Sequence, residues 1–127
     1  MDVAAAFYIG SLEDGSGVSK LMHSVAELEG KAFKTCSING DSTKGTARAN
    51  IEVLQDFQSM QNNVTKRACL EARSHKDRVM NRMQIPFIQG TPRYAYIRSN
   101  WKATDVDIAN GAAYVASIVP LVGGCSF

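Results

Sequence analysis

The fold is decided by residues 46–85, which read TARANIEVLQDFQSMQNNVTKRACLEARSHKDRVMNRMQI. This stretch contains no glycine and no proline, although the 127-residue chain has 10 glycines and 3 prolines elsewhere. Because these two residue types most often interrupt a helix, their absence predicts a long helical region at the centre of the chain.

The two halves of this region differ in their apolar pattern. In the first half, apolar residues recur three or four positions apart, which is the spacing of one helix face. They are Ala47, Ile51, Leu54, Phe57, Met60 and Val64. From Glu71 to Arg78 no residue is large and apolar, and a short patch of Val79, Met80 and Met83 follows. We therefore expect the first half to belong to the core and the second half to be largely exposed.

The length of the region limits how it can fold. Forty residues in one unbroken helix would extend about 60 Å, whereas a compact domain of this size has a radius of gyration of about 14 Å. One alternative is a helix that protrudes from the domain. The other, which we favour, is a break near Asn62-Asn63, with Asn63 capping the second part.

Further helices are predicted on both sides of the central region. The first begins at Ser16 or Ser19, both suitable N-cap residues before an amphipathic run. The last begins at Thr104, whose spacing to Asp107 is typical of a capping arrangement, and ends at Pro120 or the glycines after it. Small residues on this last helix predict close packing; they are Ala109, Ala112, Ala113 and Ala116.

Two short segments are less regular. Val3–Ile9 is apolar and fits either a strand or one helical turn. Arg93–Ile97 alternates weakly and has strand-like aromatic residues, so we predict a short strand-like or irregular segment there. Together these patterns predict a mainly α fold, with three or four helices in a single domain that covers residues 1–127.

The net charge of +2 hides an uneven distribution. Residues 1–65 carry a net charge of −3, residues 66–102 carry +7, and residues 103–127 carry −2. Such a dipolar chain favours a partner that meets its basic segment. The residues that we predict to bind a partner are the cations and methionines of that segment, namely Lys66, Arg67, Arg73, Lys76, Arg78, Met80, Arg82 and Met83.

No motif in the sequence indicates catalysis, a phosphate or dinucleotide site, or a metal site. The three cysteines, Cys36, Cys69 and Cys125, lack the spacing of zinc ligands. We therefore predict a non-enzymatic protein without a cofactor or a bound metal. The sequence assigns neither a compartment nor an oligomeric state.

A transmembrane span is not expected from the sequence. The apolar run Ile108–Val122 is interrupted by Asn110, Gly111 and Pro120. It is also shorter than the about 20 residues that a helix needs to cross a bilayer.

The function that fits these observations best is that of a small structural or accessory subunit. Its basic helical segment would dock it into a larger protein assembly with an acidic contact surface. One alternative is a nucleic-acid-binding accessory domain, in which Tyr94, Tyr96 and Trp101 would stack on bases. A second alternative is a protein with a reactive or cofactor-linked Cys69, because neighbouring cations stabilise a thiolate.

Overall fold

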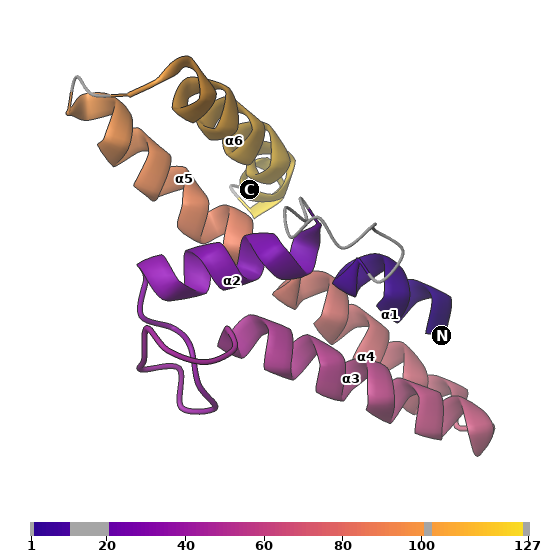
Figure 1. Cartoon of the computed structure of the whole chain (residues 1–127). Helices are drawn as coiled ribbons and strands as arrows, with labels where there is room; N and C mark the ends of the chain where they lie inside the picture. The colour runs from indigo at the N-terminus through magenta and orange to yellow at the C-terminus, as the bar shows by residue number, and fades with distance from the viewer. Residues whose placement is uncertain (1, 11–20, 101–102, 126–127) are drawn as a thin grey trace. The chain divides into compact units, whose positions relative to one another are not determined.

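The computed structural model describes residues 2–10, 21–100 and 103–125 (Figure 1). These residues form six α-helices and no strand, apart from isolated bridges that Cys36 makes with Ser42 and Ala47. The helices are α1 (Asp2–Ile9), α2 (Met22–Ala32), α3 (Arg48–Thr65), α4 (Cys69–Arg82), α5 (Ile85–Ser99) and α6 (Asp105–Cys125). The mainly α prediction is confirmed. The predicted number of three or four helices is too low, because α1 and α5 occupy the two segments with irregular patterns.

Contacts divide the chain into two compact units, Met1–Met83 and Gln84–Phe127. The first unit contains α1 to α4, and the second contains α5 and α6. The single domain therefore stays a prediction.

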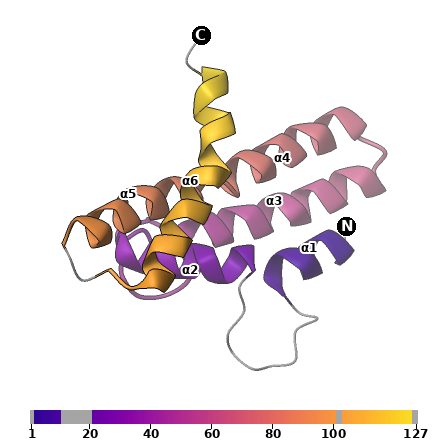
Figure 2. The same ribbon diagram turned by 90° about the horizontal axis from the view of Figure 1, so that it is seen from above.

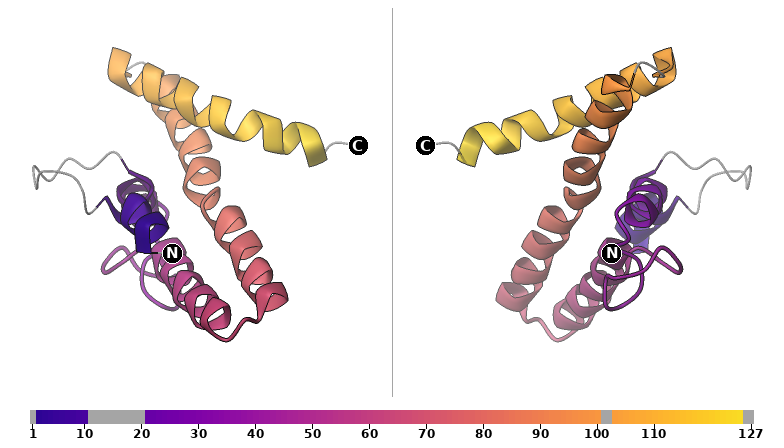
Figure 3. Two further views of the ribbon diagram at one scale, coloured as in Figure 1. Left: turned by 90° about the vertical axis from the view of Figure 1, so that its right-hand side faces the viewer. Right: turned by 90° about the vertical axis from the view of Figure 1, so that its left-hand side faces the viewer.

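A helical hairpin of α3 and α4 is the centre of the first unit. Figure 2 shows the two helices side by side, and Figure 3 shows that they diverge from the connection that joins them. The favoured alternative of a broken central helix is therefore confirmed. The two helices share the extensive interface on which the rest of this unit is built.

The break lies at Lys66–Ala68 rather than at Asn62-Asn63. Arg67 adopts a φ of 58°, its N–H donates to the carbonyl of Val64 (3.0 Å), and the next N–H donates to the carbonyl of Asn63 (2.9 Å). These two bonds and the left-handed residue form a Schellman motif. Glycine usually occupies that position, so an arginine there gives no indication in the sequence that the helix ends.

The core of the first unit combines one residue from each of three helices, Tyr8 of α1, Val53 of α3 and Val79 of α4. Half-buried side chains pack around it; they are Met22, Leu54, Phe57 and Met83. The apolar segment Val3–Ile9, for which the sequence predicts a strand or a helical turn, is part of helix α1. This helix places Tyr8 in the core. The predicted N-caps Ser16 and Ser19 lie outside the described residues.

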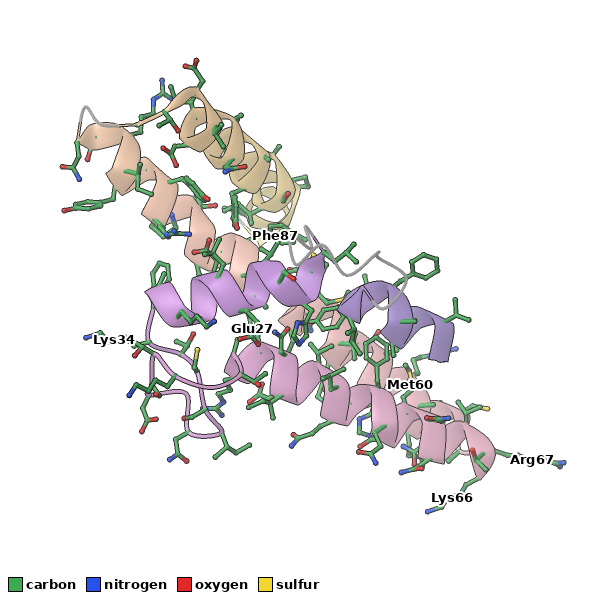
Figure 4. All side chains as sticks on the ribbon, viewed as in Figure 1. Glu27, Lys34, Met60, Lys66, Arg67 and Phe87 are labelled. Atoms are coloured by element: carbon green, nitrogen blue, oxygen red, sulfur yellow. The ribbon has the colours of Figure 1, made fainter. Side chains whose placement is uncertain are left out.

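A buried hydrogen-bond network joins α1, α2 and α3. The Tyr8 hydroxyl donates to Asn50 Oδ1 (2.5 Å), and Asn50 Nδ2 donates to Glu27 Oε1 (2.7 Å) and to the carbonyl of His23 (2.9 Å). Glu27 Oε1 also accepts the N–H of Ala47 (2.9 Å), and Figure 4 shows Glu27 at the side of α2 that faces α3. Because Asn50 is fully buried, its amide needs these partners to offset the loss of water.

Burial, with the charge of Glu27 nearby, raises the pKa of Tyr8 to about 12. The folded phenol stays protonated where the unfolded phenol, with a pKa of about 10, has ionised. The folded state therefore binds more protons between pH 10 and 12, so its stability falls as the pH rises through that window. At 1.36 kcal/mol per pKa unit, the loss is about 2–3 kcal/mol.

Tyr8→Phe removes this titration, and we expect it to flatten the alkaline loss of stability. Below pH 10 the variant is less stable than the wild type by about 1–2 kcal/mol, since Asn50 Oδ1 loses its donor. Between pH 10 and 12 that difference should shrink, which urea unfolding at pH 9 and pH 11 would measure. The lysines titrate in both proteins, so their effect cancels in this difference. A difference in unfolding free energy between the two proteins that stays constant from pH 9 to pH 11 would contradict the prediction.

In the second unit, aromatic rings pack between α5 and α6. The ring centroid of Tyr114 lies 5.1 Å from that of Tyr94 and 5.7 Å from that of Phe87. Gly90 and Gly111 let the helices approach, because a Cβ at Gly90 would meet the Tyr114 ring and a Cβ at Gly111 would lie 3.2 Å from Tyr94 Cβ. The close packing predicted for the alanines of α6 is thus made by these glycines, while the alanines are exposed.

The strand-like segment predicted at Arg93–Ile97 is wrong, because these residues lie inside α5. A helix places Gly90 and Tyr94 on one face, four residues apart, where both contact α6. This packing outweighs the strand preference of the aromatic residues, which depends strongly on context. Pro86 stands in the first turn of α5, where its missing N–H costs nothing.

Thr104 and Asp107 form the predicted capping arrangement at the start of α6. Asp107 Oδ2 accepts the N–H (2.9 Å) and the hydroxyl (2.7 Å) of Thr104, and the Asp107 N–H donates to Thr104 Oγ1 (3.2 Å). These bonds hold the pKa of Asp107 below its usual value. Of the predicted end at Pro120 and Gly123-Gly124, the proline part is wrong, because α6 passes through Pro120, where a proline forfeits one backbone hydrogen bond; the helix ends at Cys125, directly after the glycines.

Gly90→Ala should destabilise the second unit by about 1–3 kcal/mol. Alanine normally favours a helix over glycine by about 1 kcal/mol, but here its Cβ would overlap the Tyr114 ring. Gly123→Ala is the matched control, since a Cβ there meets nothing within 4 Å and should leave stability unchanged or slightly raised. Thermal unfolding measures both, and equal melting temperatures for the two variants would contradict the proposed close approach.

Candidate functional site

The side chains of α4 that contact the rest of the first unit lie on two faces. His75, Arg78 and Arg82 recur three and four residues apart and meet α3 through polar contacts. Ala72, Lys76, Val79, Met80 and Met83 recur at the same spacing on the other face. One 100° step separates the two faces. On the second face Ala72 and Val79 are buried, whereas Lys76 and Met80 are exposed and can meet a ligand.

The polar face surrounds Asp56 of α3, whose side chain is only 7% exposed. Its Oδ1 lies 2.7 Å from His75 Nδ1 and 3.1 Å from Arg78 Nε, and its Oδ2 accepts a hydrogen bond from Arg82 Nη1. Arg82 Nε also pairs with Glu52 Oε2 at 2.9 Å. Two carboxylates four residues apart on α3 therefore meet two arginines four residues apart on α4.

Arg78 and Arg82 are thus engaged within the protein, although both belong to the predicted partner-binding set. A buried carboxylate is stable only when cations and hydrogen bonds replace its water. Asp56 is the residue that reasoning from the sequence missed. The matching four-residue spacings of Glu52 and Asp56 and of the two arginines are the pattern that could have indicated it.

Asp56→Asn should destabilise the protein by about 2–4 kcal/mol, because it removes the buried charge that Arg78 and Arg82 pair with. Asp77→Asn is the matched control on α4. Asp77 pairs with Lys76 at 2.8 Å with both side chains well exposed, and such surface pairs contribute about 0–1 kcal/mol. Urea unfolding would compare the two, and similar losses in both variants would refute a structural role for Asp56.

The other face of α4 forms an apolar groove with a volume of about 470 Å³, which we call the methionine groove. It is lined by Ala4, Phe7, Tyr8, Met22, Phe57, Met60, Lys76, Val79, Met80 and Met83. Val79 and Tyr8 belong to the core and form its floor, whereas Met80 is 55% exposed and Phe7 is exposed at its edge. The groove therefore combines buried core residues with methionines, whose flexible side chains can adjust to a ligand.

A smaller cavity of about 300 Å³ continues the methionine groove toward the start of α4. The two share Met60 and Lys76, and the smaller one adds Val64, Cys69 and Arg73. Among the described residues none that lines either cavity is acidic, so their charged lining residues are the cations Arg73 and Lys76. Four of the predicted partner-binding residues, Arg73, Lys76, Met80 and Met83, are brought together here.

Lys66 and Arg67 are placed elsewhere. Both are exposed at the connection between α3 and α4, and Figure 4 shows their side chains pointing away from the helices. Of the eight predicted partner-binding residues, four therefore line the two cavities, two hold α4 to α3, and these two project from the end of the hairpin.

The described residues include no group of three or more His, Cys, Asp or Glu side chains placed to hold a metal ion. Cys36 is fully buried, and burial raises the pKa of its thiol. Cys69 is exposed at the first residue of α4. Its reactivity stays a prediction, as does the absence of catalysis.

In the second unit, Tyr94 is buried against α6, whereas Tyr96 is exposed. Trp101, the third aromatic residue of the predicted base-stacking set, lies outside the described residues. A cavity of about 570 Å³ between α5 and α6 has mostly apolar walls, with Arg98 and Asp107 among its lining residues. Burial removes the Tyr94 ring from a stacking role, which weakens the nucleic-acid alternative.

By length and composition, Asp105–Gly124 of α6 could cross a membrane. The expectation that no span exists relied on a helix interrupted at Pro120. Because α6 passes through that residue, the length argument no longer holds, and the absence of a span stays untested.

The chain matches no protein-family model, no curated protein and no solved structure.

Proposed function

We propose that this protein is a non-enzymatic accessory subunit that docks into a larger assembly by binding a helix of a partner protein in the methionine groove. The observation that carries the proposal is the groove itself, an apolar surface of about 470 Å³ with exposed Met80 and Phe7 at its edges. Pockets of this size that are mostly apolar are typical binding sites.

The composition of the groove favours a protein helix as the occupant. Four of its lining residues are methionines, Met22, Met60, Met80 and Met83. Methionine side chains are flexible and polarisable, and they are frequent on surfaces that bind the apolar face of an amphipathic helix. The groove and the smaller cavity together follow α4 from Cys69 to Met83, a length of about 21 Å, which suits about four turns of a partner helix.

Charge specifies the partner further. Lys76 lies on the wall that the two cavities share, and Arg73 follows it along the smaller one. The surface pair of Lys76 with Asp77 is exposed and weak, so Lys76 can exchange it for a carboxylate of a partner. The expected partner is therefore an amphipathic helix with an apolar face and acidic residues on its polar flank.

Met80→Glu should abolish docking, because it places a charge in the apolar groove and repels an acidic partner. Leu70→Glu is the matched control: Leu70 is on the same helix, is 78% exposed and lines neither cavity. Proteins that copurify with the wild type and with each variant are compared by quantitative mass spectrometry, and the candidate partner is then purified. We expect its Kd to rise at least about tenfold with Met80→Glu and to be unchanged with Leu70→Glu.

Three outcomes would overturn the proposal. The first is a partner that both variants lose equally, and the second is a purified partner that binds all three proteins with the same Kd. The third is copurification of nucleic acid alone, released by salt, which would favour the alternative function. Circular dichroism of both variants checks that the fold is kept.

A further inference from the structure

We propose that α6 is a lipid-binding helix, which buries its exposed apolar surface in one leaflet of a bilayer while it stays packed on α5. This site belongs to the second unit and does not depend on the methionine groove. From Ile108 to Phe127 the chain has no charged residue, and almost all of the helix is exposed.

The apolar exposure extends around most of the circumference of α6. The side that meets α5 is a narrow stripe containing Gly111 and Tyr114. With steps of 100° per residue, exposed residues lie on the remaining sides, including Val106, Ala109, Ala113 and Val119. A single partner helix covers a stripe of about 100°, so a second copy of α6 would leave much of this surface in water. A lipid phase covers all of it.

The polar groups of α6 after Asp107 are compatible with an apolar medium. Ser117 Oγ donates to the carbonyl of Ala113 (2.8 Å), and Asn110 Nδ2 donates to the Tyr94 hydroxyl (3.4 Å). Proline and glycine inside a helix are more frequent in membranes than in water, and α6 contains Pro120 and three glycines. A buried core element does not account for this helix, because little of it is buried, and an N-terminal signal does not, because it begins at Asp105.

The packing against α5 favours one leaflet over a full crossing. Among the described residues of the second unit, the charged ones lie near the connected ends of α5 and α6 or at the middle of α5; they are Arg98, Asp105, Asp107 and Arg93. Contacts along α6 reach Tyr114, which meets Phe87 in the first turn of α5. A full crossing from the charged end would carry this part of α5 into the bilayer or separate the helices. Insertion of the free side of α6 keeps the packing intact, and Figure 3 shows the C-terminal half of α6 running away from α5.

The test is co-flotation of the full chain with vesicles of phosphatidylcholine, with and without phosphatidylserine. Val119→Lys should lower the partition coefficient about tenfold or more, since a lysine in hydrocarbon is costly. Val3→Lys is the matched control, because it adds the same charge at an exposed valine of α1 and should bind like the wild type. Phosphatidylserine should increase binding, and Arg98→Gln should remove part of that increase only.

The outcomes are distinguishable. Absence of flotation by the wild type, or equal flotation of both lysine variants, would overturn the proposal. A wild-type dimer in lipid-free buffer that Val119→Lys converts to a monomer, without vesicle binding, would assign the surface to a second copy instead. A C-terminal tag should stay accessible to protease outside sealed vesicles, and its protection would replace insertion in one leaflet with a full crossing.

Discussion

The buried carboxylate of Asp56 fixes how α4 lies on α3, and the surfaces of the first unit follow from that placement. Its oxygens meet His75, Arg78 and Arg82, so one face of α4 is committed to α3. A charge in so little water is tolerated only with such partners, which makes the register of the two helices specific. The neighbouring face then carries Val79 into the core and leaves Met80 at the edge of the methionine groove.

This arrangement gives the cations of the basic segment different tasks. Arg78 and Arg82 stabilise the hairpin, Arg73 and Lys76 lie along the two cavities, and Lys66 and Arg67 project at the connection between the helices. Net charge alone does not separate these tasks, because the same guanidinium can pair with a buried carboxylate or remain in water. The choice depends on whether an acidic side chain of α3 stands opposite.

In the second unit, the packing of α5 on α6 depends on the size of the side chains rather than on their charge. Because Gly90 and Gly111 have no side chain, the rings of Tyr114 and Tyr94 can pack against them. These contacts stabilise the helical conformation of Arg93–Ile97, whose residues by themselves favour a strand. The same close approach uses only a narrow stripe of α6. The small and branched residues on its other sides remain exposed, and they form the apolar surface that the lipid proposal addresses.

The sequence by itself determined the mainly α class and the Thr104–Asp107 cap, because periodicity and capping act within a few residues along the chain. It favoured an interruption of the central helical region on grounds of length but left an unbroken helix as the alternative. It also indicated that Met80 and Met83 belong to a functional surface, which remains a proposal. Only the tertiary structure decided that the break lies at Arg67, that Arg93–Ile97 is helical and that Asp56 captures two of the predicted binding cations. The helical state of Arg93–Ile97 and the role of Asp56 depend on contacts between residues distant in sequence. The break depends on a left-handed conformation at Arg67, which glycine usually adopts and arginine rarely does.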